Sequence, residues 1–299
     1  MSDSFRCGYV ALIGRPNVGK STLLNSLLGR KLSITSRRPQ TTRHRVVGIK
    51  TSPDVQILYV DTPGLHRHAP RAMNRYLNRA ASAAIRDVDI VVFVVEGTRW
   101  TDEDELVLEK LQLTKAPVIL VLNKIDRLND KSVLLESLKT LELKGVFAHL
   151  IPLSAGSGEN VPSLEERIIE LLPQAPPVYP DDQLTDRSGR FLAAEYIREK
   201  LFRRLGQELP YGLTVEIERF KQLKGVAEIH ALIWVEKSSQ KAIVIGKGGG
   251  LLKSVGSEAR RDMESLFGCK VRLKLWVKVK KGWTDDEKAL LSLGYNENS

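Results

Sequence analysis

Short apolar runs recur through the N-terminal part of the chain, and each is followed by a segment with helical periodicity. Strands buried on both faces read as continuous apolar runs, and their alternation with helices is typical of a parallel sheet. The pattern predicts a doubly wound α/β domain. Its predicted strands span 9–13, 55–60, 90–95, 118–122 and 148–153, and its predicted helices span 20–28, 72–86, 104–113, 132–143 and 163–172.

A proline-rich stretch ends this pattern. Residues 173–180 contain four of the 13 prolines of the chain. Proline lacks an amide hydrogen and resists both helix and central strand, so the stretch predicts a stiff interdomain linker. We therefore expect a first domain at 1–172, a linker at 173–182 and a second domain at 183–299.

The second domain has a different pattern. A helix is predicted at 189–205, followed by strands at 214–221 and 226–236, and a glycine-rich turn at 246–250 opens a helix that ends near residue 267. The segment 270–280 alternates strictly, which predicts a strand with one polar face. One face carries Val271, Leu273, Leu275, Val277 and Val279, and the other carries Arg272, Lys274, Trp276, Lys278 and Lys280. The prediction is a smaller α+β domain.

Composition narrows the function classes. The 299 residues include 46 Lys and Arg against 36 Asp and Glu, a net charge of +10 that favours a nucleic-acid or acidic-lipid partner. The longest apolar run, 90–95, is too short to span a bilayer, and the polar N-terminus does not resemble a signal peptide. Cys7 and Cys269 form neither a metal-binding nor a disulfide pattern. We expect a reduced, cytoplasmic protein.

A phosphate-binding loop follows the first predicted strand. The segment from Gly14 to Ser21 matches GxxxxGK[ST] between a strand and a helix, the context that this motif requires. Its backbone N–H groups would surround phosphate oxygens, Lys20 would reach the β- and γ-phosphates, and Ser21 would bind Mg²⁺. The predicted nucleotide contacts here are Gly14, Asn17, Val18, Gly19, Lys20, Ser21 and Thr22.

Two further motifs each follow a predicted strand. Asp61-Thr-Pro-Gly64 puts a carboxylate where it can hold Mg²⁺ through water. Asn123-Lys-Ile-Asp126 selects the base, because the Asp126 carboxylate can accept two hydrogen bonds from guanine, and adenine offers no such pair of donors. Asn123 and Lys124 would support the base, and the backbone N–H groups of Ser154 and Ala155 would close the purine pocket. The three motifs together predict binding of GTP and GDP.

These motifs resemble the G domain of the translation-factor-type GTPases, and the Gly-x-Pro-Asn-x-Gly-Lys-Ser form with Thr-Thr-Arg resembles the Era/MnmE-like branch. The resemblance implies that Thr41 or Thr42 completes the Mg²⁺ shell, and we choose Thr42, because it lies centrally in Gln40-Thr-Thr-Arg-His44. The predicted metal ligands are therefore Ser21, Thr42 and Asp61. The resemblance also implies catalytic roles for Lys20, Thr42 and Gly64.

One position departs from Ras-like enzymes, in which a glutamine orients the attacking water. Leu65 stands there and can neither donate nor accept a hydrogen bond, so we expect slow intrinsic hydrolysis. Some relatives bind K⁺ through an asparagine that corresponds to Asn17, and we hypothesise that K⁺ stimulates hydrolysis.

The second domain contains a GxxG segment, Gly246-Lys-Gly-Gly249, before a helix and a basic strand. Together with the order of its elements, this segment resembles a type II KH domain, which binds single-stranded RNA. Residues 237–281 carry 12 basic and 3 acidic side chains, a net charge of +9 that suits phosphate binding. The predicted RNA contacts are Gly246, Lys247, Gly248, Gly249, Lys253 and Lys274.

Other features leave alternatives open. Residues 30–50 contain seven Lys and Arg and no acid, and they would either contact RNA or an effector, or be solvated. Trp234 and Trp276 would either stack on bases or pack within the protein.

The order of the two domains resembles the Era family of bacterial GTPases. The resemblance implies binding to small-subunit ribosomal RNA near its 3′ end, a role in small-subunit assembly, and peripheral contact with the inner face of the cell membrane; no stable protein partner follows from it. The main alternative is a membrane-surface GTPase scaffold whose basic face binds anionic lipid. A GTPase serving RNA modification and a passive RNA-binding module with a vestigial nucleotide site are weaker alternatives, because the second domain lacks a catalytic constellation and the nucleotide motifs are intact.

Overall fold

The computed structural model describes residues 5–64, 72–130, 132–206, 208–293 and 295, and the chain divides into two compact units. The first unit comprises Met1–Ser33, Thr42–Pro70 and Asn74–Asp186. The second comprises Ile34–Thr41, Arg71–Met73 and Arg187–Ser299. The short segment Ile34–Thr41 therefore belongs with the C-terminal part of the chain, although it lies early in the sequence.

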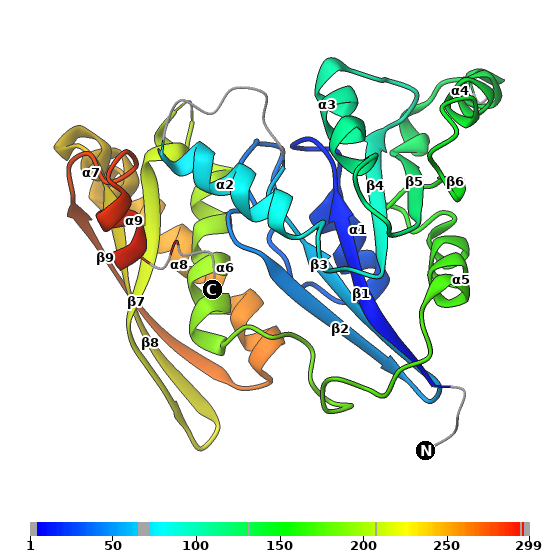
Figure 1. Ribbon diagram of the computed structural model, residues 1–299. Helices are drawn as coiled ribbons and strands as arrows, with labels where there is room; N and C mark the ends of the chain where they lie inside the picture. The colour runs from blue at the N-terminus through cyan, green and yellow to red at the C-terminus, as the bar shows by residue number, and fades with distance from the viewer. Residues whose placement is uncertain (1–4, 65–71, 131, 207, 294, 296–299) are drawn as a thin grey trace. The chain divides into compact units, whose positions relative to one another are not determined.

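The first unit is built on a six-stranded sheet with the order β2-β3-β1-β4-β5-β6 (Figure 1). All five predicted strands are present, and they run parallel to one another. The prediction missed β2, an edge strand that runs antiparallel to β3, because only three of its seven residues are strongly apolar. The strands are β1 (Arg6–Ile13), β2 (Val46–Ser52), β3 (Val55–Asp61), β4 (Ile90–Glu96), β5 (Val118–Asn123) and β6 (His149–Pro152).

Five α-helices of this unit lie where helical periodicity predicts them, with ends that differ by up to three residues. They are α1 (Lys20–Leu28), α2 (Ala72–Ala83), α3 (Asp102–Leu111), α4 (Ser132–Glu142) and α5 (Val161–Leu171). The helix α3 begins two residues earlier than predicted, because the Thr101 side chain accepts a hydrogen bond from the Asp104 N–H and forms a capping box.

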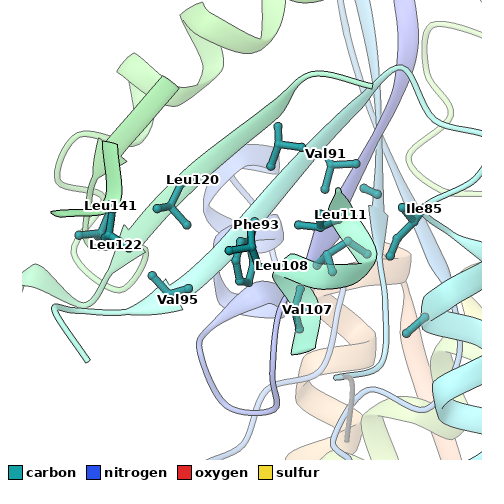
Figure 2. Close-up of a cluster of buried hydrophobic side chains, with 14 residues drawn as sticks. Ile85, Val91, Phe93, Val95, Val107, Leu108, Leu111, Leu120, Leu122 and Leu141 are labelled. Carbon is teal, nitrogen blue, oxygen red and sulfur yellow. The ribbon is translucent and has the colours of Figure 1, made fainter. Parts of the chain in front are cut away.

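Alternate residues of the central strands form the core beneath α3 (Figure 2). Val91, Phe93 and Val95 of β4 face this helix, and Leu120 and Leu122 extend the same surface along β5. Phe93 is fully buried and meets Trp100 edge to face, with ring centroids 5.8 Å apart. This packing fixes the carboxyl ends of β4 and β5, from which the segments of the candidate site emerge.

The proline-rich stretch is packed along the first unit. The Cys7 N–H donates to the Pro173 carbonyl at 3.2 Å, and the Ala175 N–H donates to the Phe5 carbonyl at 3.1 Å. Further along, the Gln56 side chain donates to the Tyr179 carbonyl at 2.8 Å. The compact units divide after Asp186, a few residues beyond the predicted linker.

The second unit has a three-stranded sheet, β7-β8-β9, in which β7 and β8 are antiparallel and β8 and β9 are parallel (Figure 1). The alternation predicted for β9 is confirmed: Val271 and Val277 are buried, whereas Arg272 and Lys274 are exposed. The prediction missed α7 and α9, two short helices. The elements are α6 (Gly189–Arg204), η2 (Leu209–Gly212), β7 (Leu213–Leu223), β8 (Val226–Val235), α7 (Ser238–Ile245), η3 (Lys247–Gly249), α8 (Gly250–Phe267), β9 (Lys270–Val279) and α9 (Glu287–Ser292).

Candidate functional site

The phosphate-binding loop connects β1 to α1 and ends at a lysine that is held inside it. Lys20 Nζ donates to the carbonyls of Gly14 and Arg15, both at 2.9 Å, and the side chain is buried. Burial lowers the pKa of Lys20 to about 8, and the nearby Asp61 carboxylate opposes that shift. A buried ammonium group that contacts only carbonyl oxygens is stabilised further by an anion bound in the loop. Thr22, another predicted nucleotide contact, lies in the first turn of α1.

Three oxygen-bearing side chains meet beside this lysine. Ser21 Oγ donates to Asp61 Oδ2 at 2.7 Å and lies 2.7 Å from Thr42 Oγ1. The structure brings Thr42 to this cluster, whereas Thr41 Oγ1 donates to the Arg38 carbonyl at 2.8 Å.

The buried Asp61 carboxylate fits a cation. Burial raises its pKa, despite hydrogen bonds and the Lys20 charge that favour the ionised form, and its Oδ1 has no hydrogen-bond partner. Two hydroxyls and a carboxylate are ligands of the type that Mg²⁺ prefers. Among the described residues, no group of three or more His, Cys, Asp or Glu side chains could hold a metal ion. Ser21, Thr42 and Asp61 together offer three oxygen ligands, and Mg²⁺ would take further ligands from the phosphates of a nucleotide.

The segment after Asp61 lies against the phosphate-binding loop. A Cβ placed on Gly64 would be 2.6 Å from the nitrogen and 2.8 Å from the Cα of Pro16, so only glycine fits this approach. Leu65, on which the expectation of slow hydrolysis depends, lies outside the described residues.

Asn123 joins three parts of the site. Its Nδ2 donates to the Val18 carbonyl at 2.8 Å, and its Oδ1 accepts from the N–H groups of Lys124 at 2.8 Å and Ala155 at 2.9 Å. Gly19 is required beside it, because its φ is +107° and a Cβ there would lie 2.2 Å from Asn123 Nδ2. The structure thus gives Asn123 a bracing role within the protein, which sequence reasoning had described only as support for the base.

The remaining base-recognition residues lie at the ends of β5 and β6. Asp126 is exposed in the 3₁₀ turn η1 (Ile125–Arg127), where a ligand can reach its carboxylate. The N–H groups that we predicted to close the purine pocket both have protein partners: Ser154 N–H donates to the Glu159 carbonyl at 3.0 Å, and Ala155 N–H donates to Asn123. A purine contact by either group would require it to exchange that partner.

Glu96 was not among the residues predicted from the sequence. It is the last residue of β4, and its carboxylate pairs with Lys124 Nζ at 2.8 Å and with Arg15 Nη2 at 3.6 Å. No short motif contains this glutamate. The available signal was its position. Glu96 ends β4, which lies in the sheet between β1, the strand before the phosphate-binding loop, and β5, the strand before the Asn123–Asp126 segment.

The GxxG segment of the second unit connects α7 to α8. The Gly246 N–H donates to the Ala242 carbonyl at 2.9 Å, the Gly249 N–H donates to the Gly246 carbonyl at 3.0 Å, and Gly248 has a φ of +57°. The side chains of Lys247, Lys253 and Lys274 are exposed.

The two tryptophans of this sheet have different surroundings. Trp276 is 42% exposed on the face that carries Arg272 and Lys274, and it packs edge to face with His230 at 5.4 Å. Trp234 Nε1 donates to Glu216 at 2.8 Å. Trp276 is therefore not a core residue.

In the basic stretch at 30–50, the Lys50 ammonium pairs with the Glu165 carboxylate at 2.6 Å.

Comparison with known proteins finds matches to both domains. A family model described as 50S ribosome-binding GTPase matches residues 9–124, and a KH-domain model matches residues 208–284. A GTPase Era from Ectopseudomonas mendocina (strain ymp) is 60% identical over 290 residues, which cover 97% of each chain.

The chain belongs to the Era family of GTPases. A second relative, GTPase Era of Pseudomonas entomophila (strain L48), is 59% identical over 99% of each chain. A crystal structure of Era in complex with MgGDPNP and nucleotides 1506–1542 of 16S ribosomal RNA matches with a TM-score of 0.93 and 36% identity, over 97% of this chain and 99% of that one. An Era variant from Aquifex aeolicus bound to GDP and AlF4⁻ matches with a TM-score of 0.92 and 35% identity, over the same shares.

Membership in the Era family confirms several expectations. The fold is a P-loop GTPase domain followed by a KH domain, and the chain is a GTPase that acts on guanine nucleotides.

Both cysteines are free thiols. Within the described residues, no helix has the length and apolar character needed to cross a membrane.

Proposed function

We propose that this Era-family GTPase is a nucleotide-controlled switch that binds small-subunit ribosomal RNA near its 3′ end through its KH domain and acts in small-subunit assembly. The observation that carries the proposal is the match, over nearly the full length of both chains, to an Era structure that holds MgGDPNP and 16S ribosomal RNA at once. The description of the G-domain model names the 50S subunit, but that model covers residues 9–124 only. The match to the Era structure includes both domains.

In this proposal the first unit binds GTP through the cluster around Lys20. Ser21, Thr42 and Asp61 would hold Mg²⁺, which supplies positive charge to the phosphates when bound. Lys20 would pair with the terminal phosphates, Gly64 would keep the segment after Asp61 close to the phosphate-binding loop, and Asp126 would accept hydrogen bonds from guanine. With leucine at position 65, we expect slow intrinsic hydrolysis; stimulation by K⁺ near Asn17 stays a hypothesis, and equal rates in KCl and NaCl would contradict it.

The second unit would sense the nucleotide through Ile34–Thr41. Within that unit, the Thr35 N–H donates to Glu199 Oε1 at 2.9 Å, Arg203 Nε donates to the Thr35 carbonyl at 3.0 Å, and Arg198 Nη2 donates to the Thr41 carbonyl. The next residue, Thr42, belongs to the first unit and contacts Ser21. One peptide bond thus joins a residue held by α6 to a proposed Mg²⁺ ligand, which supports coupling of nucleotide state to RNA binding.

The RNA interface of this proposal is the basic surface around the GxxG segment. Lys247 lies within the GxxG turn, Lys253 lies in the first helical turn of α8, and Lys274 is exposed on β9. The glycines let a phosphate backbone approach the turn closely, and the net charge of +9 over residues 237–281 favours that approach. A KH domain typically binds about four unpaired nucleotides, so the proposed ligand is a single-stranded segment.

The proposal is tested by measuring the affinity of the full chain for a single-stranded RNA from the 3′ end of 16S RNA, with a GTP analogue and with GDP. We expect a nucleotide-dependent difference of about fivefold or more, the usual size of a coupling between sites. Equal affinities would contradict the switch. Loss of RNA binding in Gly248→Asp but not in the neutral Gly248→Asn would assign the interface, because both side chains tolerate this backbone conformation and only aspartate repels phosphate.

The alternative function, a membrane-surface scaffold, uses the same basic surface. Vesicles with anionic lipid form the second arm of the experiment. Lipid binding that exceeds RNA binding and is abolished by Gly248→Asp would favour the scaffold. Lipid binding that Gly248→Asp leaves unchanged would be compatible with peripheral membrane contact through another surface.

A further inference from the structure

Glu96 connects the two segments that bind opposite ends of a nucleotide. We propose that Glu96 is a positioning residue that holds the Asn123–Asp126 segment and the phosphate-binding loop in register, one carboxylate oxygen for each. Oε1 lies 2.8 Å from Lys124 Nζ and 3.6 Å from Nη1 of Arg127, the residue after this segment, and Oε2 lies 3.6 Å from Arg15 Nη2. This role concerns how the first unit assembles its nucleotide site, so it does not depend on the RNA-binding function proposed above.

The sheet places Glu96 beside the base-recognition segment. Glu96 is the last residue of β4 and is paired in register with Asn123, the last residue of β5. The following Gly97 N–H donates to the Asn123 carbonyl at 2.6 Å. The end of β4 is therefore hydrogen-bonded through its backbone to the Asn123–Asp126 segment, and the Glu96 carboxylate at this end pairs with Lys124 of the same segment.

Lys124 is the first partner, and its backbone is in an unusual conformation. Its φ of +67° is a left-handed conformation that is unfavourable for a residue with a Cβ, so other contacts must hold it. Its Nζ donates to the Asn17 carbonyl at 2.7 Å while paired with Glu96. The glutamate thus fixes a side chain that crosses from the base-recognition segment to the phosphate-binding loop.

Arg15 is the second partner and lies in the phosphate-binding loop itself. Its Nε donates to Asp104 Oδ2 at 3.1 Å, and Asp104 also accepts from the N–H and hydroxyl of Thr101 at the start of α3. Its Nη2 is buried without a hydrogen bond, so the Glu96 carboxylate is needed to balance that end of the guanidinium. Asp104 and Glu96 together hold the Arg15 side chain from two elements.

Charge alone and positioning predict opposite effects of removing this carboxylate. A negative charge near a phosphate site repels the nucleotide, so by charge alone Glu96→Gln would tighten GDP binding. If Glu96 positions Lys124 and Arg15, the same change weakens GDP binding, because an amide pairs poorly with two cations at once. The sign of the change in affinity therefore separates the two roles.

The test measures the dissociation constant and the dissociation rate of a fluorescent GDP for wild type, Glu96→Gln and Glu109→Gln. Glu109 is an exposed glutamate of α3 in the same unit and provides the same change in charge. For Glu96→Gln we expect about five- to tenfold weaker binding, mainly from faster dissociation, as for a partly buried ion pair. For Glu109→Gln we expect less than a twofold change. Unchanged or tighter binding in Glu96→Gln would overturn the proposal.

Two further measurements exclude a purely structural role. Glu96→Asp keeps the charge, so it should lose less affinity than Glu96→Gln, and an equal or larger loss counts against charge pairing. In a cycle with Arg15→Gln, the double variant should lose less than the product of the two single losses, because each change removes the same ion pair. Losses that multiply would mean that the two residues act independently and would also overturn the proposal.

Discussion

The two loops rich in glycine show how differently one chain can build two phosphate-binding surfaces. In the first unit, the loop from Gly14 to Ser21 is enclosed: Lys20 is buried, and a Cβ on Gly19 would overlap Asn123. In the second unit, a Cβ on Gly248 or Gly249 would meet nothing within 4 Å, and the neighbouring Lys247 is exposed. The first loop is shaped by contacts within the protein. The second is packed at Gly246, where a Cβ would lie 2.8 Å from Leu251 Cβ, and has open surroundings at Gly248 and Gly249.

The difference indicates how each surface distinguishes its ligand from other anions. An enclosed site fixes donors and acceptors before the ligand arrives, so single atoms decide affinity. An open basic turn acts mainly through summed charge, so each residue contributes little and salt weakens all of them together. We therefore expect substitutions in the first loop to have large, specific effects, and we expect the removal of one positive charge around the second loop to have a small, additive effect.

The largest effect is expected for Gly19→Ala. The new methyl group would lie 2.2 Å from Asn123 Nδ2 and would displace a buried side chain with three hydrogen bonds. Loss of such bonds costs about 1–3 kcal/mol each, so GDP affinity should fall about 100-fold or more. Equilibrium binding of fluorescent GDP measures this. The matched control, Gly248→Ala, also has positive φ but open surroundings and should leave GDP affinity unchanged. A loss below threefold in Gly19→Ala would contradict the enclosed description of this loop.

The positions of both loops in the chain could be predicted from the sequence, whereas the enclosure of the first could not. The strands β1, β3, β4 and β5 are continuous apolar runs, and the first three nucleotide motifs come directly after strands, so their convergence at one sheet edge follows from a parallel sheet. The GxxG turn was also predictable, because glycine clusters seldom occur inside helices.

Features that depend on tertiary partners were not predictable. The strand β2 has a weak apolar pattern and forms only as the antiparallel neighbour of β3. No local signal shows that Ile34–Thr41 belongs to the second unit, because that depends on Glu199 and Arg203, far along the chain. Likewise, Glu96 matters through strand register, which aligns it with Asn123 and which no motif records.

A smaller and more selective effect is expected for Gly64→Ala, which tests whether close packing in the first unit extends to the segment after Asp61. The methyl group would lie within 2.8 Å of the Pro16 backbone, so one of the two segments must move. Since this segment would serve the terminal phosphate, GTP hydrolysis should fall about tenfold while GDP affinity changes less than about threefold. Single-turnover hydrolysis and GDP binding measure the two. Gly156→Ala has room for its methyl group and should change neither; equal behaviour of both variants would contradict the packing argument.

The smallest effect is expected for Lys253→Gln in the second unit. This exposed lysine follows the GxxG turn on α8, and removing one phosphate contact should weaken RNA binding only about two- to fivefold. The sharper readout is salt dependence: the slope of log affinity against log salt should fall by about 0.7, the value for one contact to a single strand. The control is Lys224→Gln, an exposed lysine in the β7–β8 turn outside the basic segment, which should leave the slope unchanged. If Lys253→Gln instead abolished binding at constant slope, the open loop would discriminate by fixed geometry, as the enclosed loop does, and the contrast between the two surfaces would fail.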